Sequence, residues 1–266
     1  MPESTATPKY QVRAVSAAFK ILNALAEQPR QTLSQLASSL GLTNSLTYRM
    51  LATLETEEMV YRDEHRRYSL GPRAMYLGYQ AQRSLPITEL AQPVIDRLAE
   101  QTNESVHLVL RTGIERVIVA LKESPQPVRV STPIGTRFPL YYGGTGLCMF
   151  AYLSHEEQEQ VLARELRPKT PETELDPEKI LATARIIRER GYHVAVRDFA
   201  DSAFSIAAPV FGADGEILAS ICVVGPESRL TPESRERIVS LAVEAGVALS
   251  AALGHAVNAA QAQATG

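Results

Sequence analysis

Hydroxyl, amide and guanidinium groups gather along one short segment of this chain, where they could hydrogen-bond to the base edges and phosphates of DNA. In the stretch NSLTYRMLATLE, apolar residues recur at Leu46, Met50 and Leu54, the spacing of one helix face. The other face would present the polar groups outward, as a helix does when it enters a major groove. The pattern also suits the solvated face of an interaction domain. The candidate DNA-contacting residues here are Thr43, Asn44, Ser45, Thr47, Tyr48 and Arg49.

A second basic cluster follows at a predicted turn. Arg62, Arg66 and Arg67 surround the sequence DEH, where they could meet phosphates or a minor groove. Glu64 and other nearby acids would repel phosphates, so the turn could instead be ordinary solvated surface.

A helix-turn-helix unit would position both clusters. Thr32 and Gln35 have the spacing of a capping box, and Gly41 ends the helix that they begin. The recognition helix comes next, and the charged hairpin after it is a wing. We place this winged domain at residues 10–71. An earlier helix would support the pair through four apolar residues, Val15, Phe19, Leu22 and Ala26.

The distribution of charge fits a DNA-binding part at the start of the chain. The 266 residues suffice for two domains, and their net charge is −3. Residues 1–73 hold nine Lys/Arg and seven Asp/Glu, whereas the remainder holds 18 and 23. Such a weak basic bias predicts modest nonspecific affinity and two DNA-binding heads at each site.

Composition excludes several other classes. Two cysteines, Cys148 and Cys222, do not support a disulfide framework, and no Cys or His pair has the spacing of zinc ligands. The first residues lack the apolar core of a secretory signal, and no apolar run approaches membrane-spanning length. We therefore expect a cytoplasmic protein with no membrane partner, no metal and no cofactor.

A linker helix is predicted between Gly71-Pro72 and Pro86, so we place it at residues 72–86. Its apolar residues would be exposed in a single chain and are expected to pack on a second copy. These residues are Met75, Tyr76, Leu77 and Tyr79.

Residues 87–254 read as a second domain in which helices alternate with strand pairs. SVHLVLR and RVIVALK flank Thr112-Gly113, and FSIAAPVF and EILASICVV flank residues 213–215, so each pair predicts a β-hairpin. Asp176-Pro177 and Thr231-Pro232 are typical helix starts. The expected fold is α+β with a central antiparallel sheet. Residues 255–266 are expected to form a small, polar, frayed tail.

The chain as a whole resembles the IclR family of bacterial transcriptional regulators. The matching pieces occur in family order from about residue 10 to residue 254: LSQLASSLGLTNSLTYRMLATLE, RRYSLGPR, IGTRFPL, the RGY that ends at Tyr192, AAPVFGADGEILAS and the closing Gly225-Pro226. The resemblance implies a winged helix-turn-helix joined by a linker helix to a GAF-like effector domain. It also implies homodimers or dimers of dimers on palindromic double-stranded promoter DNA, with small organic acids or aromatic compounds as effectors.

The segment YYGGTGLCMFA departs from the family pattern. Leu147 stands where the family usually has a lysine after glycine. The glycines and Thr145 could open a helix whose free N–H groups hold a carboxylate, or they could only allow tight helix–sheet packing.

Effector-contacting positions can be carried over from glyoxylate- or pyruvate-type relatives. Because Ala195 and Val224 are apolar here, a larger or more apolar ligand such as an aromatic acid is favoured over a small oxo-acid. Arg137 could receive its carboxylate and two tyrosines could contact its ring, although all three could also be structural. The candidate effector-binding residues are Arg137, Tyr141, Tyr142, Gly144, Thr145, Ala195, Ser205, Cys222 and Val224.

The sequence also bears on two other classes of function, an enzyme and a protein-interaction module. An enzyme could use Cys148 as a nucleophile, but no histidine has the spacing of a partner base, so no catalytic residue is predicted. Asp198 and Asp201 are expected to be solvated or to cap a turn, and His107 to be a core or pocket histidine. A protein-interaction module could use the winged domain without DNA. The residues therefore favour a ligand-responsive transcriptional regulator, repressor or activator.

Overall fold

The computed structural model of the protein describes residues 12–83 and 86–255. The chain divides into two compact units, Met1–Ser84 and Leu85–Gly266, and the division falls within the predicted linker. Residues 10–11 of the predicted winged domain, residues 84–85 of the linker and residues 256–266 of the predicted tail lie outside the described residues.

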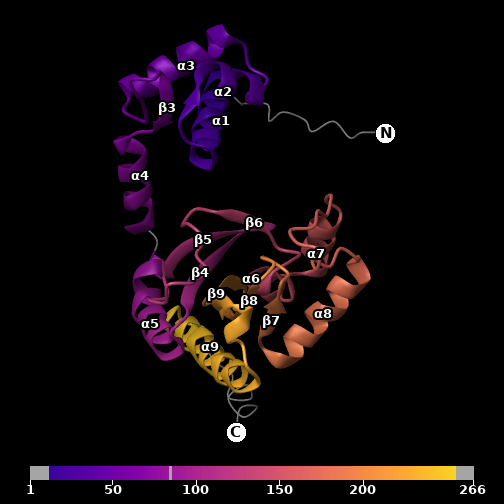
Figure 1. Cartoon of the computed structure of the whole chain (residues 1–266). Helices are drawn as coiled ribbons and strands as arrows, with labels where there is room; N and C mark the ends of the chain where they lie inside the picture. Colours follow the sequence, from indigo (N-terminus) through magenta and orange to yellow (C-terminus); the bar gives the residue numbers. More distant parts are fainter. Residues whose placement is uncertain (1–11, 84–85, 256–266) are drawn as a thin grey trace. The chain divides into compact units, whose positions relative to one another are not determined.

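The first unit contains the expected winged helix-turn-helix (Figure 1). Helices α1 (Arg13–Glu27), α2 (Leu33–Leu40) and α3 (Asn44–Thr56) precede a small antiparallel sheet. Its strand order is β1 (Gln31–Thr32), β3 (Arg67–Leu70) and β2 (Val60–Arg62). Helix α4 (Pro72–Arg83) follows the wing.

Local capping sets the turn between α2 and α3. Thr32 and Gln35 form the predicted capping box, and Gly41 ends α2 in the left-handed conformation with φ 63°. Such a conformation is strained for residues with a Cβ, so glycine is favoured there. The Thr43 hydroxyl then accepts a hydrogen bond from the Leu46 amide at 3.3 Å and begins α3.

The predicted inner face of α1 was only partly right, because Leu22 packs against the core whereas Val15, Phe19 and Ala26 are exposed. Ala17, Ile21 and Leu25 form its buried face, whereas Val15 and Phe19 are 52% and 60% exposed. Apolar residues at helical spacing occupy two faces of this helix. The face of Ala17, Ile21 and Leu25 packs against α2, α3 and β3. A second, exposed apolar face therefore remains on α1.

The second unit is built on a six-stranded antiparallel sheet, as predicted (Figure 1). In the order of the sheet, its strands are β6 (Arg137–Pro139), β5 (Glu115–Lys122), β4 (Ser105–Thr112), β9 (Ile217–Pro226), β8 (Ala203–Phe211) and β7 (His193–Val196). The hairpins β4–β5 and β8–β9 are the two predicted from alternating apolar residues.

Helices cover both faces of this sheet. Helices α5 (Pro86–Thr102) and α9 (Pro232–Ala252) pack on one face and enclose the larger apolar core. Helix α6 (Gly144–Phe150) lies on the other face, with α7 (His155–Leu162) and α8 (Pro177–Arg190) beyond it. None of the described helices is both long and apolar enough to cross a membrane.

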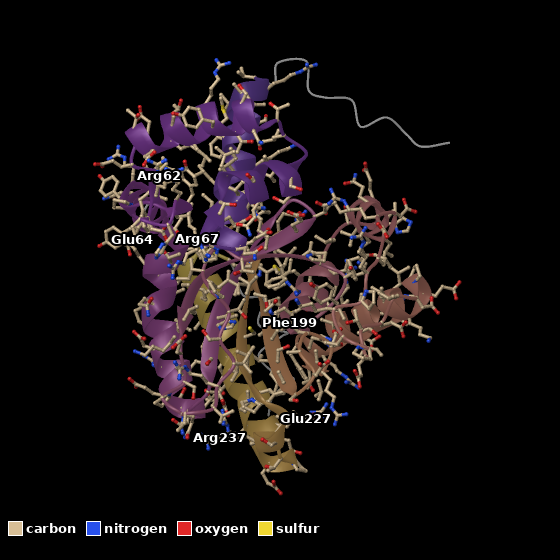
Figure 2. All side chains as sticks on the ribbon, turned by 45° about the horizontal axis from the view of Figure 1, so that its top comes forward. Arg62, Glu64, Arg67, Phe199, Glu227 and Arg237 are labelled. Carbon is tan, nitrogen blue, oxygen red and sulfur yellow. The ribbon has the colours of Figure 1, made fainter. Side chains whose placement is uncertain are left out.

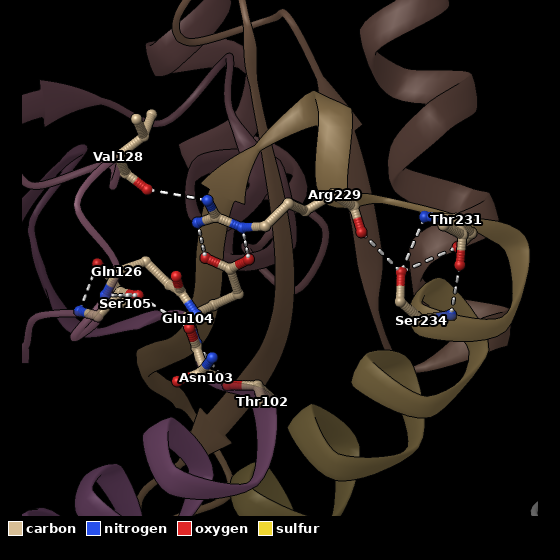
Figure 3. Close-up of polar contacts among 10 residues, drawn as sticks. Thr102, Asn103, Glu104, Ser105, Gln126, Val128, Arg229, Thr231 and Ser234 are labelled. Carbon is tan, nitrogen blue, oxygen red and sulfur yellow. Dashed lines mark hydrogen bonds and ion pairs between the residues drawn. The ribbon is translucent and has the colours of Figure 1, made fainter.

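A bidentate ion pair joins the start of β4 to the turn η1 (Glu227–Arg229) after β9 (Figure 3). Arg229 Nε and Nη2 donate to the two carboxylate oxygens of Glu104 at 2.5 and 2.6 Å, and Nη1 donates to the Val128 carbonyl at 2.9 Å. Glu104 is only 4% exposed, so this pair holds three separate chain segments together in a partly dry environment.

Candidate functional site

The outer face of α3 carries the polar groups that the sequence placed there. Asn44, Ser45 and Arg49 are exposed, and Tyr48 is 58% exposed. Residues four positions apart share a helix face, so these side chains form one continuous polar surface. Among the described residues, Arg49 has no acidic partner within ion-pair distance. The α3 surface is therefore free to meet an outside hydrogen-bonding partner.

Thr47 does not belong to that surface, which corrects its predicted role. It is fully buried, and its hydroxyl donates to the Thr43 carbonyl at 3.0 Å. The helical repeat turns this position toward α1 and α2, so its side chain supports α3 from inside. Thr43 is exposed, but its hydroxyl already caps the helix.

The wing presents Arg62, Arg66 and Arg67, which are all exposed (Figure 2 labels Arg62, Arg67 and the neighbouring Glu64). Asp63 builds its turn, because one carboxylate oxygen accepts the amides of His65 and Arg67 at 3.0 and 2.8 Å. These bonds hold the pKa of Asp63 below its usual value. The Asp63 carboxylate of the wing is thus already hydrogen-bonded to backbone amides.

A cavity opens between α6 and the sheet of the second unit. Its empty volume is about 550 Å³, counting the part that is open to solvent. Six of the predicted effector-binding residues line it, namely Gly144, Thr145, Ala195, Ser205, Cys222 and Val224. Other lining residues are apolar or aromatic, including Val109, Ile118, Phe138, Phe199 and Phe204.

The buried cation of this cavity is Arg116, which sequence reasoning missed. Arg116 lies on β5, is 2% exposed, and donates from Nη1 to the Tyr142 carbonyl at 2.6 Å. Its guanidinium carbon lies 5.5 Å from the Phe138 ring centroid and 5.3 Å from that of Tyr142. Burial lowers its pKa to about 10, so it stays charged at neutral pH.

Two amides at the start of α6, those of Gly143 and Gly144, already have acceptors, so these two do not form the open carboxylate site expected there. The Gly143 amide donates to Asp198 Oδ2 at 2.7 Å, and the Gly144 amide donates to Ser205 Oγ at 3.0 Å. Asp198 is thus partly buried and caps a backbone amide, which agrees with one of its two expected roles, the cap of a turn. Burial raises its pKa, although the bond from Gly143 and the charge of Arg116 oppose that rise.

Arg137 and Tyr141 do not line the cavity, so their predicted roles are not supported by the geometry. Arg137 is largely exposed and pairs with Glu115 at 3.4 Å. The Tyr141 hydroxyl bonds to the backbone of Arg167, at 2.8 Å to its carbonyl and 2.9 Å to its amide. Tyr142 reaches the site only indirectly, through its carbonyl and ring against Arg116.

Two kinds of buried polar group remain near the cavity. His107 lines it and is 4% exposed, and its Nε2 has no hydrogen-bond partner among the described residues. Burial lowers its pKa to about 4, so the ring is neutral at pH 7. Cys148 and Cys222 are fully or almost fully buried, and burial raises each pKa to about 12. Neither thiol therefore has the thiolate character of a nucleophile.

Comparison with known proteins covers both units. Residues 14–64 match the IclR helix-turn-helix domain, and residues 79–251 match the bacterial transcriptional regulator IclR C-terminal domain. The HTH-type transcriptional regulator KipR of Bacillus subtilis is 30% identical over 244 residues, which cover 91% of this chain and 98% of KipR.

Solved structures show the same similarity. An IclR transcriptional regulator from Alicyclobacillus acidocaldarius superposes with a TM-score of 0.84 at 29% identity, over 92% of this chain and all of that one. An IclR homologue from Microbacterium hydrocarbonoxydans, solved in complex with 4-hydroxybenzoate, has a TM-score of 0.78 at 22% identity. It covers 90% of this chain and 98% of that one.

Proposed function

Because the chain belongs to the IclR family of bacterial transcriptional regulators, we propose that α3 and the wing bind promoter DNA and that the cavity beside α6 binds a small organic effector. Residues 12–71, the described part of the predicted winged domain, form the DNA-binding part. The linker helix α4 connects it to an effector domain that begins near residue 87.

The polar surface of α3 supports direct contact with bases. Asn44, Ser45, Tyr48 and Arg49 are the residues we assign to the major groove. Arg62, Arg66 and Arg67 on the wing would contact phosphates or the adjacent minor groove. Thr43 contributes through the cap at the start of α3.

Two copies of the chain would present two such heads. Met75, Tyr76, Leu77 and Tyr79 on α4 are exposed, between 46% and 76%, as the sequence predicted. Exposed apolar side chains at this density favour burial against a second copy. A homodimer, or a dimer of dimers, would bind palindromic half-sites with two recognition helices.

The lining of the cavity supports a partly apolar carboxylic acid as the effector. Ala195, Val224 and the aromatic residues offer few hydrogen bonds to a small oxo-acid, and each unpaired polar group in such a site costs about 1–3 kcal/mol. The 4-hydroxybenzoate held by the Microbacterium hydrocarbonoxydans homologue has this character. Effector binding would shift the population of head arrangements by its differential affinity for them.

The test is fluorescence anisotropy of labelled DNA from immediately upstream of the protein's own gene, with a scrambled duplex and a salt series. The proposal predicts tight, salt-sensitive binding that favours the upstream DNA. It further predicts that an aromatic acid changes this affinity. Equal weak binding to both duplexes at low salt would contradict DNA recognition there and favour a protein-interaction module.

A further inference from the structure

Arg116 places a positive charge inside a cavity that is otherwise mostly apolar. The side chain is 2% exposed, and the described residues supply it with one hydrogen bond, to the Tyr142 carbonyl. A guanidinium has five N–H donors, so most of its hydrogen-bonding capacity remains unused. A buried charge without matching partners is unfavourable, and a second partner would relieve it.

No acidic side chain among the described residues pairs with Arg116 within 4.0 Å. Asp198 is close enough to influence its pKa, but the hydrogen bond that Asp198 accepts comes from the Gly143 amide at 2.7 Å. The rings of Phe138 and Tyr142 lie near the guanidinium and stabilise it only partly. The protein therefore does not provide Arg116 with a bidentate anion.

Other groups define the rest of the cavity. In the sheet register, Arg116 lies opposite Arg111, and His107 lies four residues earlier on β4, about 13 Å away along the strand. Val109 and Ile118 lie between these positions in the register, and Phe199 also lines the cavity. At the His107 end, Nε2 has no hydrogen-bond partner among the residues described.

We infer that Arg116 determines the specificity of the cavity by binding the carboxylate of an effector whose apolar ring lies over β4 and β5 and whose far end carries a group that hydrogen-bonds to His107. The inference rests on the proposed function and adds the residue that recognises the carboxylate of the effector. Arg116 is the residue that discriminates against uncharged analogues of the effector. Because Arg116 supplies the positive charge, Leu147 on α6 need not be a basic residue.

Matched pairs of acid and amide test this assignment. Isothermal titration calorimetry of the full-length protein would use benzoate with benzamide, 4-hydroxybenzoate with 4-hydroxybenzamide, and phenylacetate with phenylacetamide. The amides keep the shape of the acids and remove the charge. We expect at least one acid to bind at least tenfold more tightly than its amide.

Three variants test whether Arg116 causes the preference for an acid over its amide. Arg116→Gln removes the positive charge and leaves a shorter polar side chain, and it should lower acid affinity about 10- to 100-fold without changing amide affinity. Arg137→Gln removes an exposed arginine outside the cavity and should change neither. Asp198→Asn keeps an acceptor for the Gly143 amide and removes a negative charge that would repel the carboxylate of the bound acid. It should therefore tighten acid binding.

The outcomes separate this inference from the proposed function. Binding of amides as tight as that of the acids, with an effect on DNA affinity, would overturn the role of Arg116 and retain the effector cavity. Unchanged acid binding in Arg116→Gln that still folds, as judged by its melting temperature and circular dichroism, would also overturn it. Failure of every acid and amide to bind would overturn the inference and the proposed class of effector, whereas DNA binding by α3 and the wing is decided by the anisotropy measurement alone.

Discussion

Arg116 Nη1 lies 2.6 Å from the carbonyl oxygen of Tyr142, in the space that a side chain at position 146 would need. A Cβ built on Gly146 would be 1.8 Å from that same nitrogen and 3.0 Å from the Leu140 carbonyl oxygen. The glycine-rich start of α6 therefore admits the guanidinium, which links the glycine motif to the charge in the cavity.

Gly146→Ala is expected to displace the Arg116 side chain. The added methyl should lower the free energy of unfolding by about 1–3 kcal/mol, as overpacking does, and weaken acid binding. Thermal unfolding and calorimetry would measure both effects. Because the clash needs both groups, the double variant Gly146→Ala/Arg116→Gln should lose less stability than the sum of the single variants. Additive losses would contradict this steric account.

Arg49→Ala should weaken binding to the upstream DNA by about 1–3 kcal/mol if the arginine reads a base. In that case anisotropy would show a smaller loss on a scrambled duplex. Lys20→Ala removes an exposed charge from α1 in the same unit and is the matched control. Equal losses in the two variants would remove Arg49 from the recognition surface.

Thr43→Ala should destabilise the start of α3 by about 1 kcal/mol, because the Leu46 amide loses its acceptor. Hydrogen exchange of the first-turn amides in the full-length chain would detect it as faster exchange. Thr43→Ser keeps the hydroxyl and should exchange like the parent. If both variants exchange equally fast, the cap does not stabilise this helix.

Glu104→Gln should lower the free energy of unfolding of the second unit by roughly 2–3 kcal/mol. This is less than the ~3–5 kcal/mol typical of a fully buried pair, because the Arg229 side chain is 32% exposed. Glu123→Gln breaks an exposed pair with Arg129 and should cost at most about 1 kcal/mol. Denaturant unfolding would compare them, and similar losses would show that burial does not strengthen the Glu104 pair.

Stability should fall as the pH is lowered through the range set by His107. Its folded-state pKa of about 4 lies below the ordinary 6.5, so the unfolded chain takes up the proton first. The contribution of the neutral His107 ring to the free energy of unfolding is complete above about pH 6.5 and decreases toward pH 4. The expected loss between pH 7 and pH 5 is roughly 2 kcal/mol. Desolvation also lowers the pKa of the half-buried His193 to about 4, so this residue adds to the same fall.

Denaturant unfolding at several pH values would measure this dependence. His107→Gln should flatten it between pH 7 and pH 5, whereas His155→Gln should not, because the His155 side chain is 82% exposed. An unchanged slope in His107→Gln would show that this ring is not held neutral by burial.

Much of the fold could be predicted from local patterns. The capping box at Thr32, the left-handed Gly41 and the alternating strands around Thr112-Gly113 each depend on neighbours within a few residues. The inner face of α1 could not be predicted in the same way. Both of its apolar stripes satisfy helical spacing, and only packing against α2, α3 and β3 selects Ala17, Ile21 and Leu25.

The lining positions Ser205 and Cys222 were predicted from the resemblance to the IclR family, and both line the cavity. Arg116 was missed because an arginine at the start of RVIVALK reads as the exposed end of a strand. The available signal was its alternation with Ile118, which puts both side chains on the face that α6 covers. Arg137 looked equally suitable from sequence, but in β6 it lies opposite Val117, is largely exposed and pairs with Glu115.

Because Cys148 and Cys222 are buried, the native protein should give little background reaction with thiol-labelling reagents. With exposures of 0% and 2% and high pKa values, both sulfurs should react slowly with maleimides. A cysteine introduced at exposed Lys20, outside the proposed DNA-contacting surface, would then carry a fluorophore at one chosen place. The chain also has no tryptophan, so a single engineered indole would report on its own surroundings alone. The labelled winged domain can therefore be followed optically without first removing either native thiol.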